Sequence, residues 1–369
     1  LGAGNCASNN TAVGVSALTA FTGTSATAVG SGAADSATSG SQLTAVGYNA
    51  LSNITNAHYG TAVGFEAGKF AINNGNTFVG ASAGQYFGDG RDCVAIGYQA
   101  LRGEKLATDN TQSGTIASGQ PQITMDGTNA DILVGMVVTG SGIAAGSRVA
   151  TVPNPSANPQ VFLLNQNVES TIAGGSALTF YKCQGDNNIA IGSNTLGVAT
   201  IAHNSVAIGH SALGAATSGL NNTAVGAYSG DAIVTGNANT SAGVWSLSSA
   251  ATNYNSAFGY GALYAGTGSN CTGVGANAGY SATSADKLTA VGSFCFNALI
   301  DQNDNTGLGA YAGYVTIGTA NTFIGTNAGL YAGDTDDCIA IGKNALIGPA
   351  GVTNATCDYN NDPTVTHDA

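Results

Sequence analysis

The chain has 369 residues, and 20 acidic against 8 basic residues give it a formal net charge of −12 at pH 7. This balance argues against nucleic-acid binding and against an anionic membrane surface, because both need clustered Lys and Arg. No apolar run approaches the roughly 20 residues that a membrane-spanning helix requires, so we expect no membrane insertion. The 55 glycines show no G-X-Y period, which excludes collagen, and a charged fraction of 8% is atypical of a disordered chain. A repeat architecture is the class that remains.

A short motif of the form T-A-V-G or A-I-G recurs along the chain. Within each of two series its last glycine, the corner glycine, returns every 16 or 17 residues. The corner glycines are Gly14, Gly30, Gly47, Gly64, Gly80, Gly97, Gly192, Gly209, Gly226, Gly243, Gly259, Gly275, Gly292, Gly309, Gly325 and Gly342. Repeats in one register predict a solenoid in which each repeat forms one coil and its glycine turns a structural corner.

The residues before each corner glycine predict a β-strand. Val or Ile usually precedes the glycine, with Ala two residues before it, Thr three before it and often Asn four before it. Helical solenoids have repeats of about 33 to 47 residues. A period of 16 to 17 residues therefore favours an all-β fold, a parallel β-solenoid (β-roll) of about sixteen coils. In-register stacking would align Asn with Asn and Thr with Thr in hydrogen-bonded ladders.

The two faces of these strands can be assigned from hydrophobicity. Strand side chains alternate, so Val or Ile shares one face with Thr, and Ala lies on the other. We expect residues such as Val46 to fill the interior, and loop residues such as Ser52 to be exposed. The alanines would then form a bare outer stripe and an oligomer interface. This stripe consists of Ala12, Ala45, Ala62, Ala95, Ala190, Ala207, Ala224, Ala257, Ala290 and Ala340.

The repeat is interrupted between coils six and seven. The interruption has longer apolar runs, such as Val161–Leu164, and contains both methionines. Because loops tolerate insertions, we interpret it as an inserted small all-β module. The predicted organisation is coils one to six in residues 1–103, the module in 104–183, coils seven to sixteen in 184–350 and a C-terminal tail in 351–369.

Two strings, N-S-V-A-I-G at Asn204–Gly209 and N-T-A-V-G at Asn222–Gly226, resemble known repeats. They are similar to the head repeats of trimeric autotransporter adhesins, and more similar to N-T-A-V-G-x-x-A-L arrays in bacteriophage tail fibres. The resemblance covers all sixteen coils. The run Gly135–Ile143 in the module also resembles a small β-module of phage structural proteins. The resemblance implies a parallel β-roll, often trimeric, that is used for surface attachment.

These observations predict a structural subunit of a rigid extracellular or virion fibre, such as a tail fibre or surface filament, that mediates attachment. Two alternatives stay open: a polysaccharide depolymerase on a β-helix tailspike, and a monomeric carbohydrate-binding adhesin. Glycoside cleavage needs two convergent carboxylates. The chain has only three Glu, and its Asp residues mostly lie in turn-like strings such as Asp334–Asp337. We therefore expect no enzyme activity, no catalytic residue and no cofactor.

Four aromatic residues just after corner glycines are candidates for contact with a receptor glycan, because exposed rings stack on sugars. They are Tyr48, Tyr98, Tyr228 and Trp245. Packing within or between coils is the competing interpretation. The fibre's expected partners are further copies of the chain and a cell-surface glycan or receptor.

A loop near residue 303 is a weak candidate for Ca²⁺ binding. Asp301, Asn303 and Asn305 offer oxygen ligands, which Ca²⁺ prefers. The twelve-residue calcium loop with its terminal Glu is absent, so turn formation is the favoured interpretation and no metal is expected.

The seven cysteines favour an oxidising exterior. Adjacent coils would bring Cys338 and Cys357 within reach of a disulfide. An odd count leaves one cysteine for a bond between chains, for which Cys6 is the candidate. Self-association is expected, either as a homotrimer about the alanine stripe or as a head-to-tail filament.

Overall fold

The computed structural model describes residues 9–54, 58–71, 74–88, 90–103, 116–125, 132, 136–143, 147, 149–154, 160–164, 167–173, 176, 178–181, 185–198, 202–249, 252–299 and 302–347. All helix-or-strand elements in these ranges are β-strands. The prediction of an all-β parallel solenoid of about sixteen coils is confirmed.

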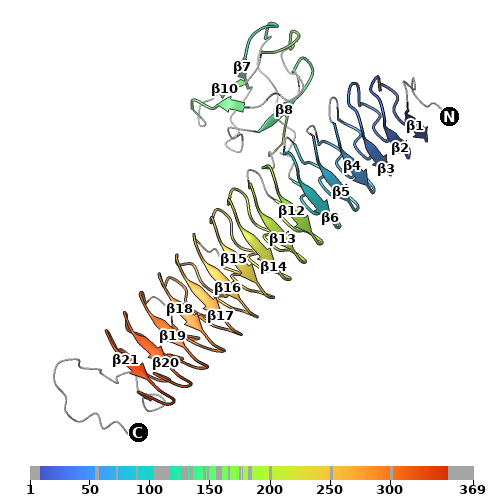
Figure 1. The fold of residues 1–369 in the computed structure, drawn as a ribbon. Helices are drawn as coiled ribbons and strands as arrows, with labels where there is room; N and C mark the ends of the chain where they lie inside the picture. The colour runs from blue at the N-terminus through green and yellow to red at the C-terminus, as the bar shows by residue number, and fades with distance from the viewer. Residues whose placement is uncertain are drawn as a thin grey trace. The chain divides into compact units, whose positions relative to one another are not determined.

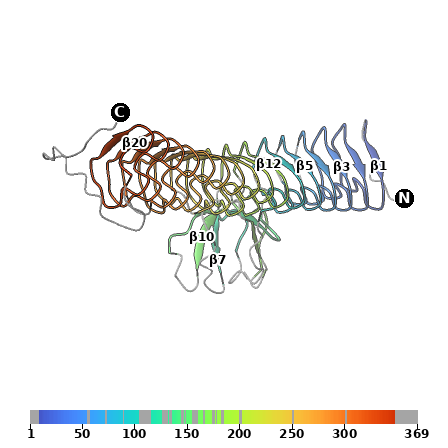
Figure 2. The same cartoon turned by 90° about the horizontal axis from the view of Figure 1, so that it is seen from below.

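The chain divides into two compact units, Leu1–Asn204 and Ser205–Ala369. Each coil contributes one strand of three residues, and these strands run parallel within each unit. The first unit contains β1 (Thr11–Val13), β2 (Thr27–Val29), β3 (Thr44–Val46), β4 (Thr61–Val63), β5 (Thr77–Val79), β6 (Val94–Ile96) and β12 (Ile189–Ile191). The second contains β13 (Val206–Ile208), β14 (Thr223–Val225), β15 (Thr240–Ala242), β16 (Ser256–Phe258), β17 (Thr272–Val274), β18 (Thr289–Val291), β19 (Thr306–Leu308), β20 (Thr322–Ile324) and β21 (Ile339–Ile341). Figure 1 shows the strands within each unit as successive rungs, and Figure 2 shows β1, β3 and β5 on one side of their coils.

Equivalent residues of neighbouring coils pair with each other, as for Thr223 and Thr240 in β14 and β15. The corner glycines permit this stacking. Their φ angles lie between +125° and +143°, a region that side chains with a Cβ rarely adopt. A Cβ on Gly226 would also lie 2.6 Å from the carbonyl oxygen of Gly243 in the next coil. The corners therefore approach too closely for any side chain.

The strand faces are the reverse of the prediction. Ala45 and Ala224 have no exposed surface, whereas Val46 is half-buried and Val225 is 40% exposed. The whole predicted outer stripe is buried, except for Ala12 in the first coil, which is half-buried. Ser52, expected to be exposed, is only 3% exposed. A Val46→Asp change would therefore place its charge outside the coil, and Ser52→Asp would not be silent.

The reason for this reversal is the thinness of the coil. The strand position two residues before the corner glycine faces the opposite wall so closely that a methyl group usually fills the space. Where Phe78 occupies this position, Gly68 and Gly84 lie against its ring, and a Cβ on either would collide with it. Large and small residues thus compensate each other across the interior, as close packing requires.

A ladder of buried polar side chains runs along the inside of the coils. Asn255 is representative: its Oδ1 accepts the backbone N–H of Cys271 at 2.9 Å, and its Nδ2 donates to the carbonyl of Gly268 at 2.8 Å. The same pair of bonds recurs at Asn10, Asn76, Asn222, Asn239, Asn305 and Asn321. Each Asn therefore satisfies backbone groups that the short strands leave without a strand partner.

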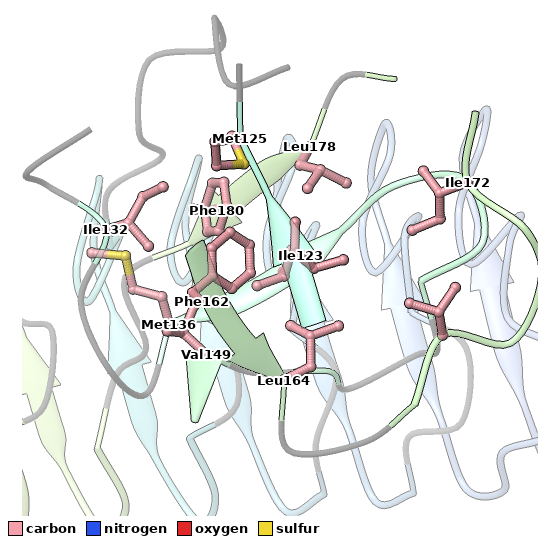
Figure 3. Close-up of a cluster of buried hydrophobic side chains, with 12 residues drawn as sticks. Ile123, Met125, Ile132, Met136, Val149, Phe162, Leu164, Ile172, Leu178 and Phe180 are labelled. Atoms are coloured by element: carbon pink, nitrogen blue, oxygen red, sulfur yellow. The ribbon is translucent and has the colours of Figure 1, made fainter. Parts of the chain in front are cut away.

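The inserted segment has a different construction. Its strands are β7 (Gln122–Thr124), β8 (Val137–Thr139), β9 (Val149–Thr151), β10 (Val161–Leu164) and β11 (Thr179–Tyr181), and all of them pair antiparallel. Its core consists of larger apolar side chains, with Phe162 and Phe180 next to each other near Ile123 and Met125 (Figure 3). β6 pairs directly with β12. The parallel ladder thus continues in register across the insertion.

Candidate functional site: the outer strand wall and the corner aromatics

The reversed faces create an apolar outer surface. We define the outer strand wall as the residues three before and one before each corner glycine, which are the two end residues of β1–β6 and β12–β21. Alternation directs both away from the coil interior. Ten of the residues that directly precede a corner glycine are exposed: Val13, Val29, Val63, Ile96, Ile208, Val225, Phe258, Val274, Leu308 and Ile341.

The outer strand wall carries no charged residue in any coil. Its position three before the glycine is mostly Thr, which adds a second row of short, β-branched side chains beside the Val and Ile row. Flat rows of β-branched residues on a pleated surface are suited to packing against another sheet. The wall is thus a repeated, uncharged and partly apolar surface.

Beyond the wall, aromatic side chains gather one or two residues after the corner glycines. Tyr48 is 51% exposed and stacks on Phe65, with ring centroids 5.5 Å apart. Tyr98 is also exposed. Tyr228 and Trp245 are exposed and lie in neighbouring coils, with ring centroids 6.4 Å apart. All four predicted glycan-contact residues thus lie on the surface.

The ring contacts of Tyr228 and Trp245 continue into the neighbouring coils. His210 packs edge-on against Tyr228 at 5.1 Å, and Trp245 contacts Tyr260 at 5.6 Å. His210 was not among the predicted aromatic residues, although it directly follows the corner glycine Gly209 and so could have been found from the coil period.

A second ladder of side chains occupies loop positions six residues before the corner glycines. Asn237 accepts the backbone N–H of Leu220 at 2.8 Å, and Asp336 accepts the N–H and hydroxyl of Thr319. These bonds hold the pKa of the Asp336 carboxyl below its usual value. Oxygen atoms in these loops therefore bind the neighbouring coil.

Two of the three predicted calcium ligands, Asn303 and Asn305, belong to different hydrogen-bond ladders. Asn303 belongs to the second ladder, where its Oδ1 accepts the N–H of Asp286 at 2.8 Å. Asn305 is buried inside the coil, with its Oδ1 bound to the N–H of Asn321. Asp301 lies outside the described residues. Asn303 and Asn305 therefore act as rungs of two different ladders, which corrects their assignment to one ion.

Three buried cysteines, Cys93, Cys271 and Cys338, occupy the ladder position four residues before a corner glycine. Cys271 stands where other coils have Asn, and its Sγ donates to the carbonyl of Ala285 at 2.9 Å. Burial raises the pKa of the Cys93 and Cys295 thiols to about 12, which makes them poor nucleophiles. Cys338 is buried in the last described coil. Cys357 and Cys6 lie outside the described residues, so both bonding predictions stay predictions.

Within the described ranges, no group of three or more His, Cys, Asp or Glu side chains is arranged to hold a metal ion. No helix in that part of the chain is long and apolar enough to cross a membrane. Comparison with protein-family models, with curated proteins and with solved structures found no match to this chain.

Proposed function

We propose that this protein is a structural subunit of a rigid extracellular or virion fibre, and that copies of the chain associate through the outer strand wall. The observation that supports this proposal is the uncharged row of mostly Val and Ile in the coils of each unit, of which ten residues are exposed and the rest half-buried. The largest apolar patch on a typical soluble monomer covers about 300–600 Å² and often marks an interaction surface. Because the row recurs in every coil, its apolar area grows with the number of coils. A large apolar area of this kind favours an interface in which a partner covers it.

A second copy of the same chain fits this wall better than an unrelated partner does. The wall repeats once per coil, and the wall of another copy repeats with the same period, so the two rows can interdigitate along their length. The net charge of −12 makes copies repel each other, while the wall itself contributes no charge to that repulsion. The homotrimer would therefore form about the Val and Ile row, because the alanines are buried inside each coil.

Attachment without catalysis is the second part of the proposal. Stacked coils of short strands give a repetitive scaffold, and the inserted module and corner aromatics would present contacts to a receptor. The competing predictions are the depolymerase and the monomeric adhesin. A depolymerase would release soluble oligosaccharides from a capsular or cell-wall polysaccharide, and the fibre subunit would not.

The test is light scattering on the purified full-length chain. We expect a stable oligomer of defined stoichiometry, and we expect Val225→Asp with Val274→Asp to shift it towards monomer by at least tenfold in dissociation constant. Both residues are exposed, so the variant should keep the melting temperature of its coils. Asn270→Asp is the matched control, because it adds a charge at an exposed loop residue outside the wall.

A wild-type chain that is monomeric at all concentrations would overturn the proposal. Assembly that survives the wall variant, yet is lost in a reductant or in Cys6→Ser, would instead indicate the head-to-tail filament linked through Cys6.

A further inference from the structure

Four aromatic side chains in consecutive coils of the second unit form a continuous strip, which we call the aromatic strip. It consists of His210, Tyr228, Trp245 and Tyr260, and all four are exposed. Successive ring centroids are 5.1, 6.4 and 5.6 Å apart. Backbone bonds fix this spacing, since the N–H of Tyr228 donates to the carbonyl of His210 at 2.8 Å.

Two residues of the strip have a strained backbone conformation. Tyr228 has a φ of +54° and Trp245 a φ of +57°. A bulky residue in the left-handed region is strained, and at the equivalent position most other coils use small or polar residues such as Asn49, Asn277 and Gly32, with Phe294 and Tyr311 as the further aromatic exceptions. Most leucines in this region, such as Leu213, are buried and gain packing in return, whereas Tyr59, Tyr254 and Tyr311 are exposed like the residues of the strip.

Tyr228 and Trp245 gain no comparable burial. Trp245 is the single Trp of the chain and is 42% exposed. A bulky residue that adopts a left-handed φ without becoming buried departs from the usual backbone preference, and such departures are expected at ligand-binding sites. The ring-to-ring contacts supply part of the compensation, so the binding role needs a test that separates it from packing.

The residues around the strip indicate that its ligand is uncharged. The corner residues beside the rings, Ser211, Ala227, Val244 and Gly261, carry no charge. Tyr and Trp present an apolar ring together with a hydroxyl or indole N–H, which suits a molecule with apolar C–H faces and many hydroxyl groups. An anionic ligand finds no Lys or Arg at these corners, and the chain as a whole is acidic.

We propose that the aromatic strip binds a neutral, linear saccharide that lies along the stacking direction of the coils. One ring per coil would meet successive sugar units of one chain, so affinity should rise with oligosaccharide length until four rings are covered. This inference rests on the proposed attachment function and names the class of receptor that the fibre would bind.

The experiment uses the full-length protein and neutral gluco- and manno-oligosaccharides of one to six units as probes. Trp245 reports directly, because no other Trp contributes to the fluorescence. We expect quenching or a blue shift that saturates, with affinity at least tenfold higher for four units than for one. Calorimetry should give a tenfold or greater loss in Trp245→Asn and in Tyr228→Asn.

Asn is the chosen replacement because it tolerates the left-handed conformation. If the rings only pack together, these variants lower the melting temperature and no oligosaccharide binds at millimolar concentration. If they bind sugar, the melting temperature stays equal or rises while affinity falls. Tyr264→Ala, which removes a ring stacked on Tyr280 outside the strip, is the control and should retain affinity.

Three results would overturn the inference: no binding of any neutral probe, unchanged binding in both Asn variants, or binding only of oligosaccharides that contain uronic acids. Oligomeric state is measured on the same samples. Assembly without saccharide binding refutes only the aromatic strip, whereas saccharide binding by a persistent monomer refutes the wall-mediated fibre.

Discussion

The repeat coils and the inserted module are both built from β-strands, but different interactions hold them together. In the coils, the interior is filled mainly by Ala, Gly and Leu, and buried Asn side chains link each coil to the next. In the module, antiparallel strands enclose twelve larger apolar side chains (Figure 3). The coils thus combine apolar burial with hydrogen bonds that repeat along their axis, whereas the module relies on its cluster of larger apolar side chains.

This difference explains how an insertion can interrupt a repeat without disturbing it. The backbone N–H of Val94 donates to the carbonyl of Asn188 at 2.9 Å, and Leu101 donates to Thr195 at 2.9 Å, as in uninterrupted coils. The module has its own core, and none of its described strands joins the parallel ladder. Each region should therefore respond to its own class of mutation.

The largest effect is expected at a coil corner. Gly226→Ala would place a Cβ against the carbonyl of Gly243 and force an unfavourable φ, so we expect a loss of about 4 kcal/mol or more in unfolding free energy. Chemical denaturation followed by circular dichroism measures it. Gly342→Ala is the matched control, because its φ is +125° but no atom lies within 4 Å of its Cβ position. Equal losses in both variants would mean that φ strain, and not coil contact, dominates.

The next effect separates the two regions. Phe162→Ala removes a fully buried ring that packs edge-on against Phe180 at 5.4 Å, which should cost the module about 3–5 kcal/mol. Hydrogen exchange should then rise in β7, β9 and β10 while β5 and β14 keep their protection. Val161→Ala, on the half-buried side of the same strand, should have a much smaller effect. Loss of protection in the coils would show that module and coils unfold together.

The period, the corner glycines, the parallel strands and the Asn ladder could all be predicted from the sequence, because they follow from repetition alone. The facing of the strands could not be obtained from the T-A-V alternation. Alternation separates Ala45 from Val46 but does not say which is inside, and hydrophobicity favoured the wrong answer. The decisive constraint is the coil's thickness, a tertiary property.

Two sequence signals could have corrected the facing. Asn and Ala lie four and two residues before the corner glycine, so they share a face, and a ladder of Asn amides needs burial to be effective. In addition, Phe78 and Phe323 replace inner alanines in coils where glycine stands four residues after the corner, at Gly84 and Gly329. That exchange of large for small residues is typical of an interior. Of the aromatic strip, Tyr228 and Trp245 were predicted as glycan contacts, and His210 was not. That the rings of adjacent coils touch depends on the coil stacking, which the sequence alone does not give.

A smaller effect tests the inner ladder. Asn255→Ala would leave the N–H of Cys271 buried without its partner, while the carbonyl of Gly268 would keep only the hydroxyl of Thr252 as donor, at a cost of about 1–3 kcal/mol. Asn255→Cys should recover part of that loss, because the chain already uses Cys271 at this position, where its thiol donates to a carbonyl. Thermal melts of both variants and of the wild type measure the difference. Equal melting temperatures for wild type and Asn255→Ala would contradict the stabilising role of the ladder.

The smallest effect concerns the pH dependence of stability, for which two carboxyl groups of the second unit, Asp231 and Asp336, have opposite pKa shifts. Burial raises the pKa of the Asp231 carboxyl, although hydrogen bonds from Ser248 and the backbone act in the other direction. The folded chain therefore holds this proton more tightly than the unfolded chain. Ionisation favours unfolding, and stability falls as pH rises from the unfolded pKa of about 3.9 through the higher folded value.

Asp231→Asn removes that ionisation, so its melting temperature should be slightly higher than that of the wild type at pH 7 and equal to it near pH 3. Asp336→Asn should show the opposite sign. Its pKa is lowered by the N–H and hydroxyl of Thr319, so its charge adds stability above the unfolded pKa, and that stability is lost as pH falls. Melting curves of both variants between pH 3 and 7 decide the matter. A lower melting temperature for Asp231→Asn at pH 7 would mean that the bond from Ser248 outweighs the cost of burying the charge.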